Sequence, residues 1–137
     1  MIALLGRVRK EMNGAVSESM STDGENYGLN YGVSIATLRE IASTEPKDMD
    51  FAKYLYQQQV RELRLIACHL AESDKVDIHD FPFWARGIRN AELAEELAFA
   101  LLSKIYDINS LMGIWTTESN ELIAYAAIMA AARNKRT

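Results

Sequence analysis

The chain has 137 residues, of which 49% are hydrophobic and 25% charged, with 7 Gly and 2 Pro. This length suits one domain with an ordinary core, and the shortage of turn-forming residues argues against a sheet-rich, collagen-like or disordered chain. The formal net charge of −4 argues against a strong sequence-independent grip on nucleic acid, because such a grip is built from clustered Lys and Arg. A local basic face is still compatible with this charge.

The N-terminus and the cysteine and histidine content exclude several other classes. The apolar residues 1–5 are followed within two turns by basic residues, so we expect neither a signal peptide nor a membrane span, and a cytoplasmic protein. The single cysteine, Cys68, lies in an apolar run typical of a core and has no disulfide partner. His69 and His79 lack the spacing of a metal site. We therefore expect no metal and no cofactor.

Apolar spacing predicts helix along almost the whole chain. Steps of three and four residues predict a first helix over 2–20, which ends at the loop residues 21–24. Ser34 is a natural N-cap for a helix over 35–42, and Pro46 prevents that helix from continuing. The later predicted helices, with the expected N-cap in parentheses where one is identified, are 51–58 (Asp50), 60–71, 80–86 (Asp77), 90–105, 110–115 (Ser110) and 120–133 (Ser119).

The predicted helices form repeated pairs. A Glu-Leu dipeptide opens each long helix at 62–63, 92–93 and 121–122, and an aromatic residue precedes each one: Tyr56, Trp84 and Trp115. We expect these aromatics to pack between repeats, with a base-stacking role as the alternative. The pattern predicts an all-α, HEAT-like α-solenoid of antiparallel helix pairs, with about eight helices. A compact irregular α-bundle would give similar periodicity.

The predicted solenoid is one domain over residues 1–137. It comprises an N-terminal part, 1–45, and three helical pairs, 48–75, 77–105 and 107–134. The sequence ends after an Ala-rich helix with no obvious polar capping repeat, which predicts either a shortened protein that self-associates there or the N-terminal part of a longer one.

Several short stretches follow one another in a recognisable order: Met12-Asn13-Gly14, the turn Leu29–Ser34 leading into Leu38–Ala42, Leu55-Tyr56, and Val60–Arg64. Together they resemble the HEAT-like-repeat DNA alkylation repair proteins, the AlkD-like group. In that family a Tyr/Phe-Gly-Val-Ser turn starts a helix that ends in Arg and Ile-Ala, and a Leu-Trp pair precedes an Arg-Glu helix. The similarity extends from about Arg9 to Arg133.

This resemblance implies an α-solenoid whose concave, usually positive, face binds DNA. Active members of the family are glycosylases that release cationic alkylated purines such as 3-methyladenine and 7-methylguanine. Because those bases are good leaving groups, the enzyme mainly has to stabilise positive charge on the deoxyribose, with a carboxylate and aromatic faces.

The family's site residues are only partly matched in this chain. By resemblance, Glu95 takes the place of the essential aspartate and Glu92 that of the first acidic residue, whereas Asn90 or Ala91 replaces the aromatic. The family's DNA-holding arginine falls close to Tyr125. Both glutamates also lie in the first two turns of a predicted helix, where the helix dipole alone would favour acidic residues.

Basic residues near the starts of consecutive repeats are candidate nucleic-acid contacts. Arg61, Arg64, Arg86 and Arg89 would form a phosphate-tracking row if all of them faced one side. The alternative is a set of solvated arginines paired with neighbouring carboxylates.

Three functional hypotheses follow from these observations. The first is a DNA alkylation repair family protein that binds duplex DNA and is catalytically degenerate. The second is an active alkylpurine glycosylase that uses Glu95. The third is a helical-repeat module that binds a protein partner or a second copy of itself through the C-terminal repeat, with methionines contributing adaptable apolar surface.

Overall fold

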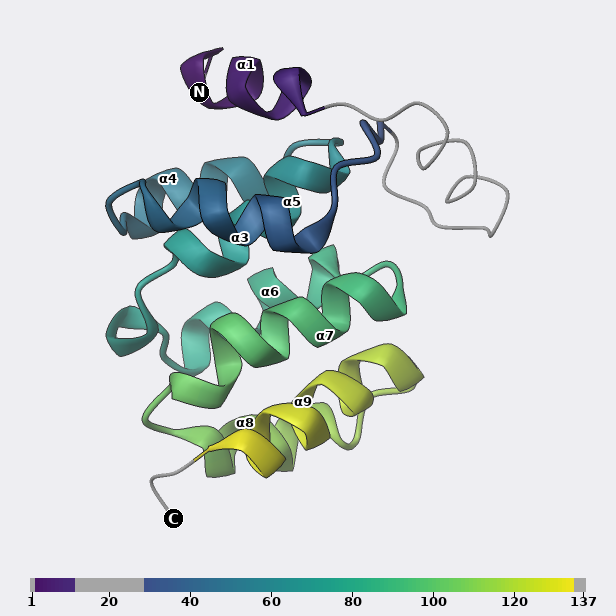
Figure 1. Ribbon diagram of the computed structural model, residues 1–137. Coiled ribbons are helices and arrows are strands. Elements are labelled where there is room, and N and C mark those ends of the chain that lie inside the picture. Colours follow the sequence, from purple (N-terminus) through teal and green to yellow (C-terminus); the bar gives the residue numbers. More distant parts are fainter. Residues whose placement is uncertain (1, 12–28, 135–137) are drawn as a thin grey trace. The chain divides into compact units, whose positions relative to one another are not determined.

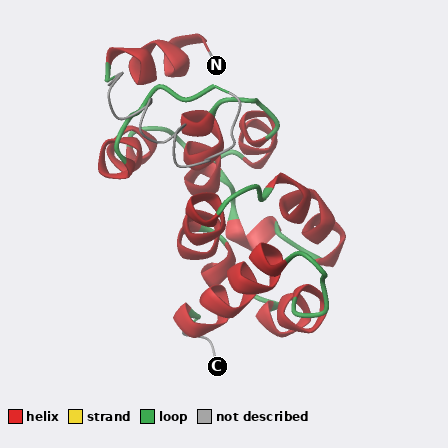
Figure 2. Cartoon of the chain, turned by 90° about the vertical axis from the view of Figure 1, so that its right-hand side faces the viewer, coloured by secondary structure: helices red, strands yellow, loops and turns green. Residues whose placement is uncertain are grey.

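The computed structural model describes residues 2–11 and 29–134, and within them the chain is helical (Figures 1 and 2). The described α-helices are α1 (Ile2–Lys10), α3 (Ile35–Ser43), α4 (Met49–Tyr56), α5 (Arg61–Leu70), α6 (Phe81–Gly87), α7 (Ala91–Ala100), α8 (Ile108–Trp115) and α9 (Glu121–Arg133). Short 3-10 helices η1 (Ser73–Lys75), η2 (Ile78–Asp80) and η3 (Leu102–Lys104) lie between some of them. The all-α prediction and the expected helix number are therefore confirmed for this part of the chain.

Some predicted helix ends are wrong, although the helices themselves are present. The N-cap of α4 is Asp48, whose carboxylate accepts a hydrogen bond from the Phe51 amide, and not Asp50. Likewise Asp107 caps α8 in place of Ser110, and Asn120 caps α9 in place of Ser119. The predicted N-cap of α3, Ser34, is confirmed, whereas Asp77 caps η2 ahead of α6.

Two long predicted helices also differ in the structure. The predicted helix over 90–105 ends at Ala100, and the chain then enters η3. Of the first predicted helix, over 2–20, the structure describes α1 and then Glu11, which lies in a turn. The remainder of that predicted helix and the predicted loop over 21–24 lie outside the described residues.

The chain divides into two compact units, residues 1–71 and residues 72–137. In the first unit, α5 packs against α3 and α4, and the buried side chains include Leu38, Leu55 and Ile66. Cys68 is also fully buried, which confirms its assignment to the core. On α1, Leu4 and Val8 are buried.

The second unit is built around large aromatic side chains. Trp84 on α6 and Trp115 on α8 are buried, and the ring of Phe81 meets that of Trp115 edge to face, with centroids 6.5 Å apart. Tyr56 in the first unit is buried as well. The prediction that these aromatics are packing residues is therefore confirmed. Helices α7 and α9 pack side by side in this unit (Figure 1), as do α8 and α9.

A buried ion pair anchors the segment that leads into α3. The Glu62 carboxylate accepts hydrogen bonds from the amides of Tyr31, at 3.0 Å, and Val33, at 3.1 Å. Arg61 donates to Glu62 at 2.8 Å and to the Val33 carbonyl at 2.7 Å. Gly32 has a φ of 72°, a left-handed conformation that glycine adopts readily, and this lets both flanking amides point at one carboxylate.

Candidate nucleic-acid interface

The structure brings together two of the site residues predicted by resemblance. Glu95 lies on α7 and Tyr125 on the adjacent α9, and the Tyr125 hydroxyl donates a hydrogen bond to Glu95 Oε1 at 3.0 Å. Glu95 is exposed, and Tyr125 is 40% exposed. The position that the resemblance assigns to the family's acidic residue thus presents a carboxylate to solvent, and the neighbouring phenol orients it.

The same contact changes the titration of the tyrosine. The hydrogen bond to Glu95 raises the pKa of the Tyr125 phenol above its ordinary value of 10.0, and desolvation and the negative charge of Glu95 add to the shift. At neutral pH the phenol therefore keeps its proton and continues to donate to the carboxylate.

The structure shows a second contact on the same two helices that the sequence motifs do not predict. Phe99 follows Glu95 by one helical turn on α7 and is 39% exposed. The Arg133 guanidinium, two turns beyond Tyr125 on α9, lies 5.2 Å from the centroid of the Phe99 ring. The i, i+4 spacing from Glu95 to Phe99 could have revealed the aromatic residue.

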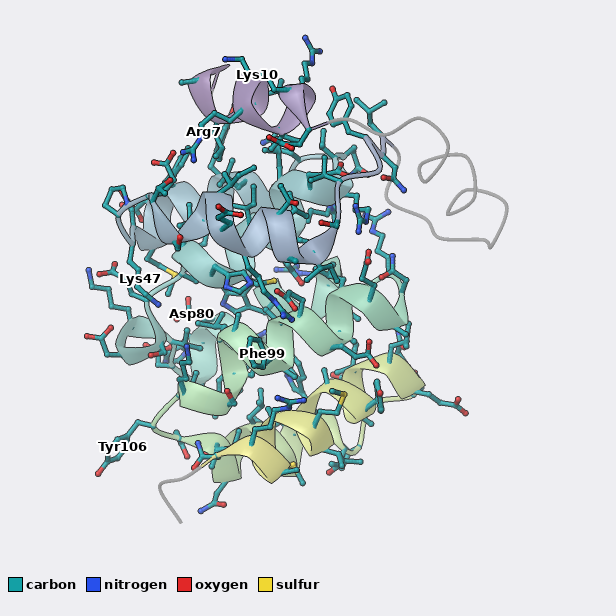
Figure 3. All side chains as sticks on the ribbon, viewed as in Figure 1. Arg7, Lys10, Lys47, Asp80, Phe99 and Tyr106 are labelled. Carbon is teal, nitrogen blue, oxygen red and sulfur yellow. The ribbon has the colours of Figure 1, made fainter. Side chains whose placement is uncertain are left out.

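We call Glu95, Phe99, Tyr125 and Arg133 the α7–α9 face. Figure 3 shows Phe99 on α7, on the side of the molecule turned toward the viewer. The face combines one carboxylate, one guanidinium and two partly exposed aromatic rings. An aromatic ring with an adjacent guanidinium can stack on a base and contact a phosphate, which are the two interactions that single-stranded nucleic acid offers without regard to sequence.

The other residues of the acidic motif have structural explanations. Glu92 is half-buried in the first turn of α7, where its negative charge interacts favourably with the positive end of the helix dipole. Asn90 is buried and caps α7 by accepting a hydrogen bond from the Leu93 amide at 2.9 Å. Ala91 is exposed and has no ring. No aromatic side chain therefore stands at the position where the resemblance places one.

The predicted row of four arginines is not supported by their burial. Arg61 is fully buried with Glu62, and Arg64 is 3% exposed, donating to the Gln58 carbonyl at 2.6 Å. Arg86 and Arg89 are exposed. The first two arginines are thus part of the interior of the first unit, and only the last two are available on the surface.

None of the described helices is long and apolar enough to cross a membrane.

The comparisons with known proteins place this architecture among DNA repair proteins. A search of curated proteins finds no significant match. A solved structure described as "a new family of proteins related to the HEAT-like repeat DNA glycosylases with affinity for branched DNA structures" matches with a TM-score of 0.82 at 16% identity, which confirms the HEAT-like fold. That match covers 94% of this chain and 55% of the other, so the chain spans about half the length of that relative. The family model of the DNA alkylation repair enzymes matches residues 5–137. The chain therefore belongs to the DNA alkylation repair enzyme family.

Proposed function

We propose that this protein binds DNA through the α7–α9 face and is catalytically degenerate. The observation that supports this most directly is the pair of contacts on that face, Tyr125 with Glu95 and Arg133 with Phe99, in a chain that belongs to the DNA alkylation repair enzyme family.

The two halves of the face suit different parts of a nucleic acid. Arg133 and Phe99 offer a cation for a phosphate and a ring for a base. Glu95 repels phosphate, but its carboxylate can accept a hydrogen bond from the exocyclic amine of a base. Because Glu95 repels phosphate and can accept from a base, the face favours DNA with accessible bases over a continuous duplex.

The similar structure points to the same class of ligand. It is described as having affinity for branched DNA. Taking a base out of the stack costs less where its pairing is already disturbed than inside a continuous duplex. We propose that this chain prefers branched DNA to linear duplex of the same length.

Fluorescence anisotropy at low salt tests this proposal with a four-way junction and a matched linear duplex. We expect tighter binding of the junction by the wild-type protein and a loss of about five- to 150-fold for Phe99→Ala, because stacking on one aromatic ring contributes about 1–3 kcal/mol. Tyr106→Ala is the matched control, since Tyr106 is 85% exposed and lies outside the α7–α9 face. No binding at high micromolar protein, or equal binding by wild type and Phe99→Ala, would exclude this face.

The proposed degeneracy rests on the surroundings of Glu95. An exposed carboxylate is surrounded by water, which weakens its stabilisation of a developing cation. We expect release of 7-methylguanine from methylated duplex DNA at the rate of spontaneous depurination. Release above that rate by the wild type, lost in Glu95→Gln, would instead support the active glycosylase.

A protein partner is a second candidate function, favoured by exposed apolar side chains in the C-terminal repeat. Ile128 on α9 is 53% exposed and Ile114 on α8 is 38% exposed. Such surface supports self-association or capture of another protein. Light scattering tests the first possibility: a concentration-dependent dimer that Ile128→Lys returns to monomer supports it, and a monomer at all concentrations rejects it.

A further inference from the structure

The helical pair formed by α8 and α9 differs from the earlier helices in its lack of charge. Helix α8 contains no charged residue, and α9 contains none between Glu121 and Arg133. Exposed helix faces ordinarily carry charged side chains, as α3 does with Arg39 and Glu40. The residues from 122 to 132 therefore give α9 a surface that is uncharged where it meets solvent.

Burial along α9 follows a seven-residue repeat. Apart from Arg133 in its last position, the exposed residues of this helix are Glu121, Tyr125, Ile128 and Ala132. Their spacings of four, three and four residues put them on one side of the helix, as in the seam of a coiled coil. We call these four residues the α9 stripe. The residues at its two flanks are apolar and half-buried: Leu122, Ala124, Met129 and Ala131.

The α9 stripe is complementary to itself when two copies of it are antiparallel. In a parallel pair, Glu121 of one copy would face Glu121 of the other, and the two carboxylates would repel each other. In an antiparallel pair, Glu121 lies at the level of Ala132 and Arg133 of the second copy, and Tyr125 lies opposite Ile128. Each contact then occurs twice, because the two helices are related by a two-fold axis.

We propose that two copies of this protein associate through the α9 stripe, with their α9 helices antiparallel. This proposal rests on the self-association given above as the second candidate function, and it specifies the contact and the orientation. Ile128, which is 53% exposed, lies near the middle of the contact. The stripe and its flanks supply eight residues per copy, fewer than the roughly 20–30 per side of a standard interface. The dimer is therefore weak.

Tyr125 belongs both to the α9 stripe and to the α7–α9 face. Its hydroxyl donates to Glu95 on α7, and the residue is 40% exposed. Ile128 belongs to the stripe alone, and Phe99 belongs to the α7–α9 face alone. Substitution of Ile128 therefore tests the dimer contact without removing a residue from the proposed DNA-binding face.

Sedimentation equilibrium of the whole chain, in the absence of DNA, tests the contact. We expect a monomer–dimer equilibrium whose dissociation constant rises about tenfold or more in Ile128→Lys, because the dimer then holds two charged side chains in an apolar contact. Ile78→Lys is the matched control, since Ile78 is an isoleucine of the same unit that is 46% exposed and lies on η2, outside the stripe. Circular dichroism of both variants verifies that they are folded.

The outcomes separate the contact from self-association in general. A wild-type protein that stays monomeric up to millimolar concentration overturns both the proposal and the second candidate function. A dimer that Ile128→Lys and Ile78→Lys weaken equally overturns the α9 contact and leaves self-association standing. Neither outcome bears on DNA binding, which is measured separately with Phe99→Ala.

Cysteine cross-linking tests the orientation of the two helices. Mild oxidation of an equimolar mixture of Glu121→Cys and Ala132→Cys should link one copy of each, as identified by intact mass, because these positions are opposite each other in the antiparallel pair. Ala132→Cys alone should link poorly, since its two copies are about 16 Å apart along the helices. The native Cys68 is fully buried and does not compete. Efficient linking of Ale132→Cys to itself would show parallel helices and overturn the proposed orientation.

Discussion

At the scale of single residues, two glutamates of this chain have opposite environments. Glu62 is fully buried, paired with Arg61 and bonded to two backbone amides. Glu95 is exposed and accepts one hydrogen bond, from Tyr125. Burial decides their roles, because a desolvated carboxylate is retained only where its partners replace water, whereas a solvated one can meet a ligand.

Glu62→Gln should destabilise the protein strongly. The substitution leaves the Arg61 guanidinium buried without its counter-charge, which typically costs about 3–5 kcal/mol. Urea denaturation at pH 7 measures this loss. The control is Glu95→Gln, an exposed substitution expected to change the free energy of unfolding by less than about 0.5 kcal/mol. Equal effects of the two variants would contradict the assignment of Arg61 and Glu62 to a buried pair.

Tyr125 should titrate above the ordinary pKa of a tyrosine phenol, 10.0. Because the pKa of Tyr125 is raised in the folded state, its protonated phenol adds to the free energy of unfolding. This stabilisation is complete below about pH 10 and is lost as the pH rises through the pKa of the folded state. NMR of tyrosine labelled at the ring carbon that bears the hydroxyl measures the shift. In Glu95→Gln the pKa should return toward 10.0, and an unchanged value would show that Glu95 is not its cause.

At the scale of elements, helix positions follow from the sequence but several helix ends do not. Two or more residues able to cap a helix often stand within one turn, as Ser119 and Asn120 do before α9. Either side chain could accept a hydrogen bond from a backbone amide in the first turn of the helix. How the helix packs decides at which of the two residues it begins. The end of α7 was missed for a related reason: apolar residues continue through Leu101 and Leu102, both fully buried, so periodicity shows no break there.

The cap of α9 can be tested with neighbouring substitutions. Asn120→Ala removes the side-chain oxygen that accepts from the Leu122 amide at 2.9 Å, and should cost about 1 kcal/mol. Ser119→Ala should cost much less, because Ser119 is exposed and is not the cap. Urea denaturation of both variants provides the comparison. A larger loss for Ser119→Ala would restore the cap predicted from sequence.

At the scale of the whole molecule, the negative net charge limits how DNA can be bound. The formal charge is −4, and the exposed basic residues among the described residues of the second unit are Lys75, Arg86, Arg89, Lys104 and Arg133. If about three of these five cations contact phosphates of a bound DNA, few counterions are released. The protein should therefore obtain its affinity from a few specific contacts and not from a broad basic surface.

The dependence of DNA binding on salt tests this limit. With about three phosphate contacts, the dissociation constant for a four-way junction should rise about 20-fold between 50 and 150 mM salt. Anisotropy titrations at several salt concentrations give the slope, and Arg133→Gln should reduce its magnitude by about one. A slope several times steeper would indicate a basic surface that the described arginines do not provide.

The helical class, the core aromatics and the family resemblance follow from the amino-acid sequence alone. Periodic apolar positions, and large aromatics at repeated places before long helices, are local properties that survive whatever the packing angle is. Trp84 and Trp115 could be assigned to the core on that basis, and the family model confirms the resemblance.

Which polar residues contact one another depends on how the helices pack. Glu95 and Tyr125 are 30 positions apart, and whether they touch depends on how α7 and α9 are rotated against each other. The same applies to Phe99 with Arg133, and to Arg61, whose predicted place on the surface is wrong because the segment before α3 and its own helix enclose it. Side-chain pairing across helices is a property of packing geometry, and a single sequence does not specify that geometry.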